Sequence, residues 1–377
     1  MKFGVSFFMQ NYEDWGRHTA RAFDEPPATA DHTVWDRALG LADLVEPLGF
    51  DSLWTVEHHF TPYTMVPNPL QFLSYMAART SRVDMGTMVV VLPWHDPVEV
   101  AEQMSLLDVM LGGRELTVGL GRGAGRVEFE GFRIPMSESR DRFAEALEVL
   151  RLAIGKESFS YDGEYYQLPE MSVRPRPRNP QGLLDRLYQA WGSPETVPMA
   201  ARANLGPLFI PQKTWEEIRE EVDVFNSIRT EMELPPSKPI VAVWVACFPT
   251  DEQAWEIAFP YMSNYNDSVL RHYEFGDPEH FAETGVYDYY ADRARKRATV
   301  TADEATEAFA TNQVWGSPAR CIEVLRKIKE ITGAAEFIGI FDYGGMPTEL
   351  AEESMRRFAE EVLPVVHADD SMTASLD

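Results

Sequence analysis

Three adjacent ionisable side chains, Glu57, His58 and His59, end the predicted strand Ser52–Glu57. Histidine titrates near neutral pH and also binds metals, so the pair suits a general base, a metal ligand or a structural hydrogen-bonding group. Side chains alternate across a strand, and a strand that continued here would point His58 and His59 to opposite sides. We therefore expect at most one of them to face a central site. No further cluster of His or Cys completes a tetrahedral set of ligands, so we expect no metal site.

A glycine-rich segment, Gly119–Gly125, closes another predicted strand and contains Arg122. A dinucleotide-binding fingerprint would open a helix at once, but the following residues, Val127–Gly131, do not predict one. The segment is therefore either a flexible turn or a loop whose backbone can approach an anion closely. Arginine presents a planar fork of donors that matches phosphate oxygens, which gives the second interpretation its chemistry.

Ser193 and Pro194, within Gly192–Thr196, are residues preferred at the N-cap and the first position of a helix. The sequence therefore predicts a helix start, and the N-terminus of a helix is also a favourable site for an anion. A second Ser-Pro pair, at 317–318, shows that the pattern alone is not specific. Arg140 lies in the predicted first turn of another helix and by itself indicates only a surface arginine.

Eight predicted strands alternate with helical segments and would position these residues at their ends. The helical segments carry apolar residues at helical spacing, as in Pro97–Leu111, which stops at Gly112. This alternation favours a single (β/α)8 barrel of the TIM type over residues 1–367, with residues 368–377 as a loose tail, and a doubly wound sheet is the alternative. The strands are predicted at Lys2–Phe8, Ser52–Glu57, Asp84–Leu92, Glu115–Leu120, Leu187–Trp191, Leu205–Ile210, Ile240–Phe248 and Glu336–Phe341.

Three segments exceed the plain alternation: Gln10–Ala30, Phe159–Pro180 and Asn264–Asn312. The second contains a predicted hairpin with its turn at Asp162-Gly163. Loops that follow the strands of a barrel gather at its catalytic face, so we expect insertions at that face. The third segment is rich in Phe and Tyr, which would either line an apolar substrate pocket or form a small core of their own.

The composition limits the classes of partner. The 34 Lys and Arg against 60 Asp and Glu give a formal net charge of −26, which argues against nucleic acid or an anionic membrane as a partner. No stretch approaches the roughly 18 apolar residues that a membrane span requires. Two cysteines, Cys247 and Cys321, are too few for a disulfide framework, so we expect a reduced, cytoplasmic chain.

Several motifs, taken in order along the chain, resemble those of the bacterial luciferase family of flavin-dependent monooxygenases. The resemblance runs from about residue 1 to 367 and implies a TIM barrel that binds reduced FMN and activates dioxygen at the flavin C4a position. Its substrate would be a small organic molecule, apolar or aromatic. The motifs are Glu57–Phe60, Val90–Pro93 followed by Asp96-Pro97, Leu107–Met110 before Gly113-Arg114, Gly119–Gly123 and Phe358–Pro364.

The resemblance also implies roles for individual residues. His58, the first histidine of the Glu-His-His-Phe motif, would be the catalytic histidine. The arginines and the turn that contains Ser193 would bind the flavin phosphate, and the Met88-Val89 peptide aligns with a non-proline cis bond beneath the flavin. The cofactor-binding residues implied in this way are Met88, Val89, Arg122, Arg140, Gly192, Ser193 and Thr196.

One departure from the family pattern, one contrast with F420-dependent relatives and one missing motif lead to the remaining expectations. Bacterial luciferase has a reactive cysteine where this chain has Gly121, which argues against light emission. Relatives that use the deazaflavin F420 usually show Ser-Asp-His in place of Glu57-His58-His59, which favours FMN. No dinucleotide-binding segment is evident, so reduced flavin would come from a separate NAD(P)H:flavin reductase. We also expect the chain to form a homodimer. The alternatives are a non-catalytic flavin-binding protein or accessory subunit of the same fold, and an F420-dependent oxidoreductase.

Overall fold

Eight parallel strands close into a barrel in the computed structural model, which describes residues 1–210, 212–282, 284–285 and 287–369. The strands pair in the order β9-β11-β1-β2-β3-β4-β7-β8. Leu208 pairs with Ile240 and Phe209 with Val241, which joins β8 to β9 and completes the circle. The TIM-barrel prediction is confirmed, and the doubly wound alternative is wrong because such a sheet is open. The strands are β1 (Lys2–Phe7), β2 (Ser52–Thr55), β3 (Asp84–Val91), β4 (Leu116–Gly121), β7 (Leu187–Ala190), β8 (Gly206–Phe209), β9 (Ile240–Cys247) and β11 (Glu336–Ile340).

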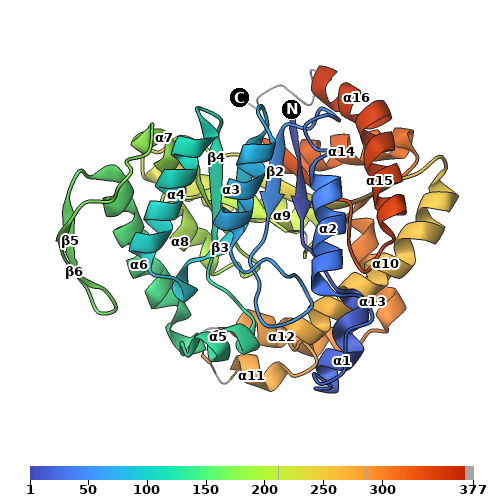
Figure 1. The fold of residues 1–377 in the computed structure, drawn as a ribbon, viewed down its shortest axis with the longest axis horizontal. Helices are drawn as coiled ribbons and strands as arrows, with labels where there is room; N and C mark the ends of the chain where they lie inside the picture. The colour runs from blue at the N-terminus through green and yellow to red at the C-terminus, as the bar shows by residue number, and fades with distance from the viewer. Residues whose placement is uncertain (211, 283, 286, 370–377) are drawn as a thin grey trace.

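Helices cover the outside of the barrel (Figure 1). The strands can be apolar throughout for this reason, and in β9 all eight residues are buried. Helix α4 shows how the ends of a covering helix are set: the Asp96 carboxylate accepts from the Val98 amide at its start, and Gly112 has a φ of 68° at its end. The covering helices are α2 (Asp31–Ala42), α3 (Pro69–Arg79), α4 (Pro97–Leu111), α6 (Ser139–Gly155), α8 (Thr196–Arg202), α9 (Trp215–Glu231), α14 (Pro318–Thr332) and α15 (Thr348–Arg357).

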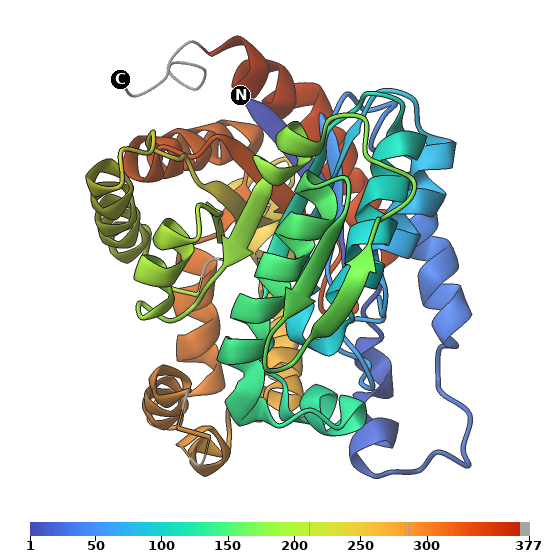
Figure 2. The same ribbon diagram turned by 90° about the vertical axis from the view of Figure 1, so that its left-hand side faces the viewer.

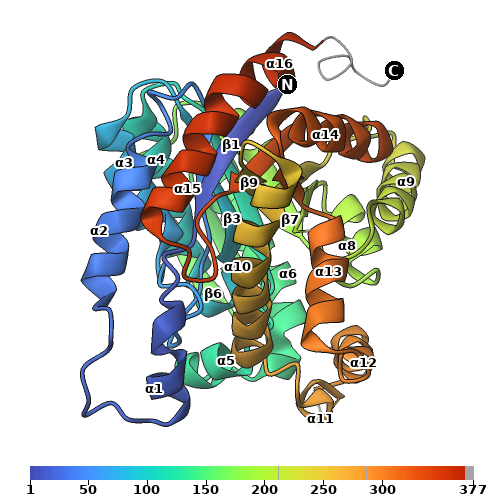
Figure 3. The same ribbon diagram turned by 90° about the vertical axis from the view of Figure 1, so that its right-hand side faces the viewer.

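Short helices gather at the end of the barrel where the strands have their C-termini (Figures 1 and 3). They are α1 (Trp15–Thr19), α5 (Arg126–Phe132), α11 (Pro278–Ala282) and α12 (Asp288–Arg297). Helices α10 (Asp251–His272) and α13 (Ala302–Thr311) pack side by side and connect this end to the barrel wall. Two predicted insertions, Gln10–Ala30 and Asn264–Asn312, therefore lie where we expected them.

The remaining predicted insertion, Phe159–Pro180, lies elsewhere. The hairpin itself is confirmed, with β5 (Phe159–Asp162) antiparallel to β6 (Gln167–Met171). It runs along the outer surface of α6, in front of the barrel in Figure 2, because the Glu145 carboxylate accepts from the amides of Tyr165 and Tyr166. This segment follows a helix rather than a strand, so the rule that places insertions at the catalytic face does not apply to it.

Helix α10 begins well before the predicted insertion and contains Asn264, so the predicted boundary is wrong. Pro260 lies inside this 22-residue helix. Proline usually ends a helix because it lacks an amide hydrogen and crowds the preceding turn, which is why the sequence pattern does not predict α10. The remaining short elements are the 3-10 turns η1 (Tyr12–Asp14), η2 (Leu92–Trp94) and η3 (Met136–Glu138), helix α7 (Pro180–Leu184), strand β10 (Val314–Gly316), the π-helical turn η4 (Phe358–Val362) and α16 (Leu363–Ala368).

The predicted C-terminal tail is only partly described. Ala368 is the last residue of α16, and residues 370–377 lie outside the described residues. Among the described residues, no helix is both long and apolar enough to span a bilayer.

A buried polar cluster closes the N-terminal end of the barrel. Glu336 opens β11, and its carboxylate accepts hydrogen bonds from the Ser52 hydroxyl and, at 3.3 Å, from the Trp54 indole. The indole fits because β1 and β3 carry glycine beside it, and a Cβ at Gly86 would overlap its ring. Burial raises the pKa of Glu336 to about 7, although Ser52 and Lys2 favour its charged form and Asp51 opposes it.

We expect this cluster to make folding stability fall as the pH rises. Glu336 keeps its proton up to about pH 7 in the folded protein but loses it near pH 4.5 when unfolded, so its ionisation lowers stability by about 3 kcal/mol between pH 4.5 and pH 8. Glu336→Gln keeps an oxygen for Ser52 and Trp54 but cannot ionise. Urea unfolding at pH 5 and pH 8 should therefore show a smaller loss in the variant, and equal losses in both proteins would contradict the expectation.

Candidate active site

A cavity of about 140 Å³ lies at the C-terminal ends of β2, β3, β4, β7 and β8. Tyr273, which follows α10, and Tyr290 of α12 also line it. Of the residues predicted for the site, four line this cavity: His58, Met88, Val89 and Gly192. The peptide between Met88 and Val89 is cis, as the resemblance implies.

His58 lines the cavity and His59 does not, which confirms that only one of the pair faces a central site. The strand ends at Thr55, however, so the separation comes from the turn that follows and not from strand alternation. His58 Nδ1 lies 3.0 Å from Oε1 of Glu128, and its Nε2 lies 3.3 Å from the Tyr273 hydroxyl. His59 turns away and contacts Glu57 at 3.0 Å.

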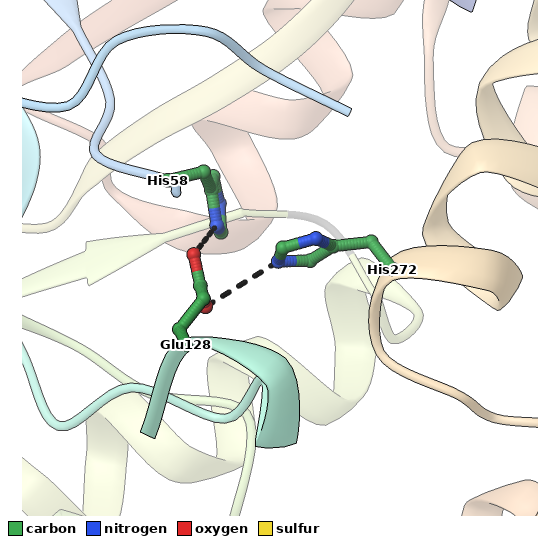
Figure 4. Close-up of side chains that lie close together, drawn as sticks. All are labelled: His58, Glu128 and His272. Carbon is green, nitrogen blue, oxygen red and sulfur yellow. Dashed lines mark hydrogen bonds and ion pairs between the residues drawn. The ribbon is translucent and has the colours of Figure 1, made fainter. Parts of the chain in front are cut away.

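Glu128 is the principal site residue that the sequence argument missed. It lies in α5, a helix that begins at Arg126, so the expectation of no helix there is wrong. Its side chain is fully buried between His58 and His272, which approaches the second carboxylate oxygen to 3.4 Å (Figure 4). The amide of His59 also donates to Oε1 at 2.9 Å. These residues are about 70 to 210 positions apart in the chain, so no local motif could have grouped them.

The charges in this cluster are unequal. Burial by itself raises the pKa of Glu128, but His272 and His58 outweigh it and lower that pKa to about 2. Burial lowers the pKa of His272, which is therefore neutral near pH 7. The ligand atoms of the three side chains lie within 4.8 Å of one another, so the sequence argument against a metal, which rested on the lack of such a cluster, was wrong in its premise. The 3.0 Å contact of His58 with Glu128 is nevertheless a hydrogen-bond distance.

A second buried carboxylate, Glu57, has a structural role. It accepts from His59 at 3.0 Å, from His95 at 2.7 Å and from the Val91 amide at 2.8 Å. Burial raises the pKa of Glu57, but these three partners outweigh it and leave the pKa below its ordinary value. Burial lowers the pKa of His95, and Glu57 outweighs that effect, so the His95 pKa is raised. Glu57 and His95 thus form an ion pair that joins the ends of β2 and β3.

Arg122 and Arg140 both lie near Tyr287, which belongs to the predicted insertion Asn264–Asn312, called the late insertion below. The Arg122 guanidinium lies 4.4 Å from the centre of the Tyr287 ring. Burial raises the pKa of Tyr287 to about 12, against the opposing influence of the Arg122 and Arg140 charges nearby. The Tyr287 hydroxyl donates to the Gly123 carbonyl oxygen at 2.7 Å. The two arginines therefore share one region beside the cavity, as the resemblance implies.

The turn at Ser193 joins this region but does not start a helix. Helix α8 begins at Thr196 with Glu195 as its N-cap, so the predicted serine cap is wrong. The Ser193 hydroxyl is buried and has no partner among the described residues, and the same is true of Nε of Arg140. Arg140 reaches the turn through a 3.1 Å contact with Glu195. Buried polar atoms without a partner commonly mark a place that a ligand or water completes.

Gly121 has a steric reason to be glycine. A Cβ at this position would overlap the Val89 side chain, since β3 and β4 shift register between Thr87 and Val90. A cysteine here would need Val89 to move. The close packing of Val89 therefore accounts for glycine, rather than the cysteine of luciferase, at position 121.

Comparison with known proteins gives the family. The sequence matches the luciferase-like monooxygenases over residues 1–335. The chain belongs to that family. An alkanal monooxygenase alpha chain from the Kryptophanaron alfredi symbiont is 26% identical over 350 residues, which cover 90% of this chain and 95% of that protein.

Solved structures share the fold. Monooxygenase RslO1 from Streptomyces bottropensis has a TM-score of 0.74 at 25% identity, over 97% of this chain and 99% of that chain. The oxygenating constituent of 3,6-diketocamphane monooxygenase from Pseudomonas putida, in complex with FMN, has a TM-score of 0.69 at 18% identity, over 97% and 98%. F420-dependent enzymes share the fold as well. The protein is thus an oxidoreductase of a family whose structural neighbours use flavin-type cofactors.

Proposed function

We propose that the protein is a monooxygenase that uses reduced FMN and dioxygen to oxygenate a small apolar or aromatic molecule. The observation that carries this proposal is the pair of buried, unpartnered atoms, Nε of Arg140 and Oγ of Ser193, in the region that Arg122 shares. A phosphate would give both atoms a partner, because its oxygens accept from guanidinium and hydroxyl groups alike. FMN joins such a phosphate to an aromatic ring system, and the cavity beside this region is lined in part by aromatic side chains.

The walls of the cavity support this fit. Gly121 and Gly192 contribute no side chain, while Trp94 and Trp191 present aromatic surfaces. Reduced FMN, when bound, supplies the electrons that activate dioxygen. The protein must then keep water away from the reacting atoms, and the aromatic walls serve that purpose.

His58 would act as the base, and Glu128 decides which of its nitrogens is free. An ionised carboxylate can only accept hydrogen bonds, so neutral His58 donates from Nδ1 to Glu128. Its Nε2 then keeps a lone pair, which can take a proton. The arrangement supports an enzyme over the non-catalytic flavin-binding alternative, because binding alone requires no oriented base.

The late insertion would exclude water from this base. Its residues form a second hydrophobic core with the end of β3 and with helix α5, which supports a place at the barrel mouth. The cavity beneath it, about 140 Å³, is smaller than the roughly 300 Å³ at the lower end for ligand sites, so we infer that the insertion moves to admit FMN and substrate. The core consists of Val91, Trp94, Phe129, Met136, Phe281, Tyr287 and Ala291.

The proposed source of reduced flavin remains a separate NAD(P)H:flavin reductase. This part of the proposal rests on the glycine-rich segment around Arg122. That segment leads into α5, a helix of seven residues, whereas a dinucleotide fold would have a long helix there.

A phosphate site predicts that Arg140→Gln weakens binding of reduced FMN by about 10- to 150-fold, the loss of one charge-assisted hydrogen bond. Riboflavin, which lacks the phosphate, should bind wild type and variant equally. Anaerobic fluorescence titration measures both affinities. Arg142→Gln is the matched control, because Arg142 lies on the same helix and pairs with Glu138. Equal affinity of wild type for reduced FMN and riboflavin, or a preference for F420, would contradict the proposal.

The orientation of His58 predicts that His58→Ala keeps its affinity for reduced FMN but loses about 10²–10⁴ in the rate of substrate oxygenation. His59→Ala should lose less activity, since its ring bonds to Glu57, although its melting temperature should fall. Product formation from a panel of small aldehydes, ketones and phenols, followed by mass spectrometry, gives the rates. The reverse ranking in two folded variants would overturn the assignment of the base.

The cover over the cavity predicts that Tyr290→Ala raises the ratio of hydrogen peroxide to product, because Tyr290 lines the cavity and its loss admits water. Tyr289→Ala removes an equal side chain that contacts Lys213 and Arg293 instead, and it should leave the ratio unchanged. Peroxide is measured with a peroxidase-coupled dye. Unchanged coupling in folded Tyr290→Ala would remove the covering role.

A further inference from the structure

The end of helix α10 reaches His58 from the far side of the barrel mouth. His272 is the last residue of the helix and Tyr273 follows it. Both rings contact the His58 ring, with centroids 4.7 Å and 5.8 Å away. The proposed function assigns neither residue a role, yet each approaches a different part of the base.

His272 approaches the base through Glu128. Its Nε2 lies 3.4 Å from Oε2 of Glu128, the carboxylate oxygen that His58 does not use. Its Nδ1 lies 2.8 Å from the Thr61 hydroxyl, which already accepts from the Tyr63 amide at 3.4 Å. An ionised carboxylate can only accept hydrogen bonds, so the approach of Nε2 to Glu128 favours neutral His272 with its ring proton on Nε2 and with Nδ1 accepting from the Thr61 hydroxyl. At 3.4 Å the contact of Nε2 with Oε2 is too long for a well-formed hydrogen bond, and neither of these buried atoms has another partner among the described residues, so His272 is the side chain placed to pair with that oxygen.

Tyr273 approaches the base directly. Its hydroxyl lies 3.3 Å from Nε2 of His58, the nitrogen left with a lone pair, and the residue lines the cavity. Burial raises the pKa of Tyr273 well above its usual value, so the phenol keeps its proton and donates it to the hydrogen bond. The lone pair of His58 is thereby already occupied by Tyr273, and a group in the cavity meets the phenol first.

We propose that the end of α10 completes the base: Tyr273 is a catalytic residue that relays a proton to His58, and His272 is a positioning residue that holds Glu128. In the relay, the proton of an acidic group in the cavity moves to the Tyr273 oxygen as the phenol's own proton moves to Nε2 of His58. The group becomes an anion, His58 becomes an imidazolium paired with the Glu128 carboxylate, and no electrons are exchanged. The assignment of a reaction rests on the proposed function, whereas the hydrogen bonds do not.

The role of His272 is tested by a pair of substitutions. His272→Gln keeps a donor near the position of Nε2, and His272→Asn loses it because its amide is one carbon shorter. In protein labelled with 15N-histidine, His58 of wild type and His272→Gln should show one neutral tautomer, protonated at Nδ1. His272→Asn should show a mixture of tautomers. A single unchanged tautomer in folded His272→Asn would overturn the positioning role.

The role of Tyr273 is tested against Tyr265, another buried phenol on α10, whose hydroxyl contacts Tyr63 at 3.1 Å. Tyr273→Phe should shift the 15N resonance of His58 Nε2 and slow oxygenation by about 10²-fold, with the affinity for reduced FMN unchanged. Tyr265→Phe should do neither. A Nε2 resonance or a rate equal to that of wild type in Tyr273→Phe would overturn the relay. If wild type oxygenates nothing, the proposed function fails, and the resonances still decide whether His272 and Tyr273 hold the base as described.

Discussion

The burial of one negative charge governs the architecture of the site. Removing a carboxylate from water costs several kcal/mol unless its oxygens are bonded, so Glu128 can remain ionised only if donors surround it. Two parts of the chain surround it: the turn after β2 supplies the His58 ring and the His59 amide, and α10 places His272 3.4 Å from the second oxygen. The ends of β2, α5 and α10 are therefore brought together by the same demand, and the cavity forms where they meet.

The two adjacent histidines contact different buried carboxylates, His58 contacting Glu128 and His59 contacting Glu57, and the two carboxylates differ in their surroundings. Glu57 has both oxygens bonded, by His59, by His95 and by the Val91 amide, so its charge is balanced and its surroundings are rigid. Glu128 faces a neutral His272 and the cavity-lining His58, so its charge is available to stabilise a proton on His58. One buried carboxylate thus links the ends of two strands, and the other orients the His58 ring beside the cavity.

Local sequence patterns were sufficient for the barrel and for the expectation that at most one of the two histidines faces the site, because buried strands and polar residues at strand ends are visible in short segments. The choice of His58 came from the resemblance. They failed where a distant contact decides the outcome. Helix α5 and its Glu128 are ordered by His58 and His272, and α10 continues past Pro260 because it packs against α13 and β9. The Ser193 turn was predicted as a cap from two residues, yet its hydroxyl has no hydrogen-bond partner among the residues that the structure describes. The roles of the phosphate residues came from resemblance, since spacing alone marked Arg140 only as a surface residue.

The ring of Tyr287 over the Arg122 guanidinium connects two events that occur at different places. The ring faces the same cation that an anionic ligand would approach, and it belongs to the segment that covers the cavity. A movement of the Arg122 side chain would therefore displace Tyr287 and the segment that contains it. A movement of that segment would in turn change the electrostatic potential at an anion bound to Arg122. Thermodynamic linkage requires the two effects to be equal in size, so the strength with which the anion is held and the ease with which the cavity opens are set by a single coupling free energy.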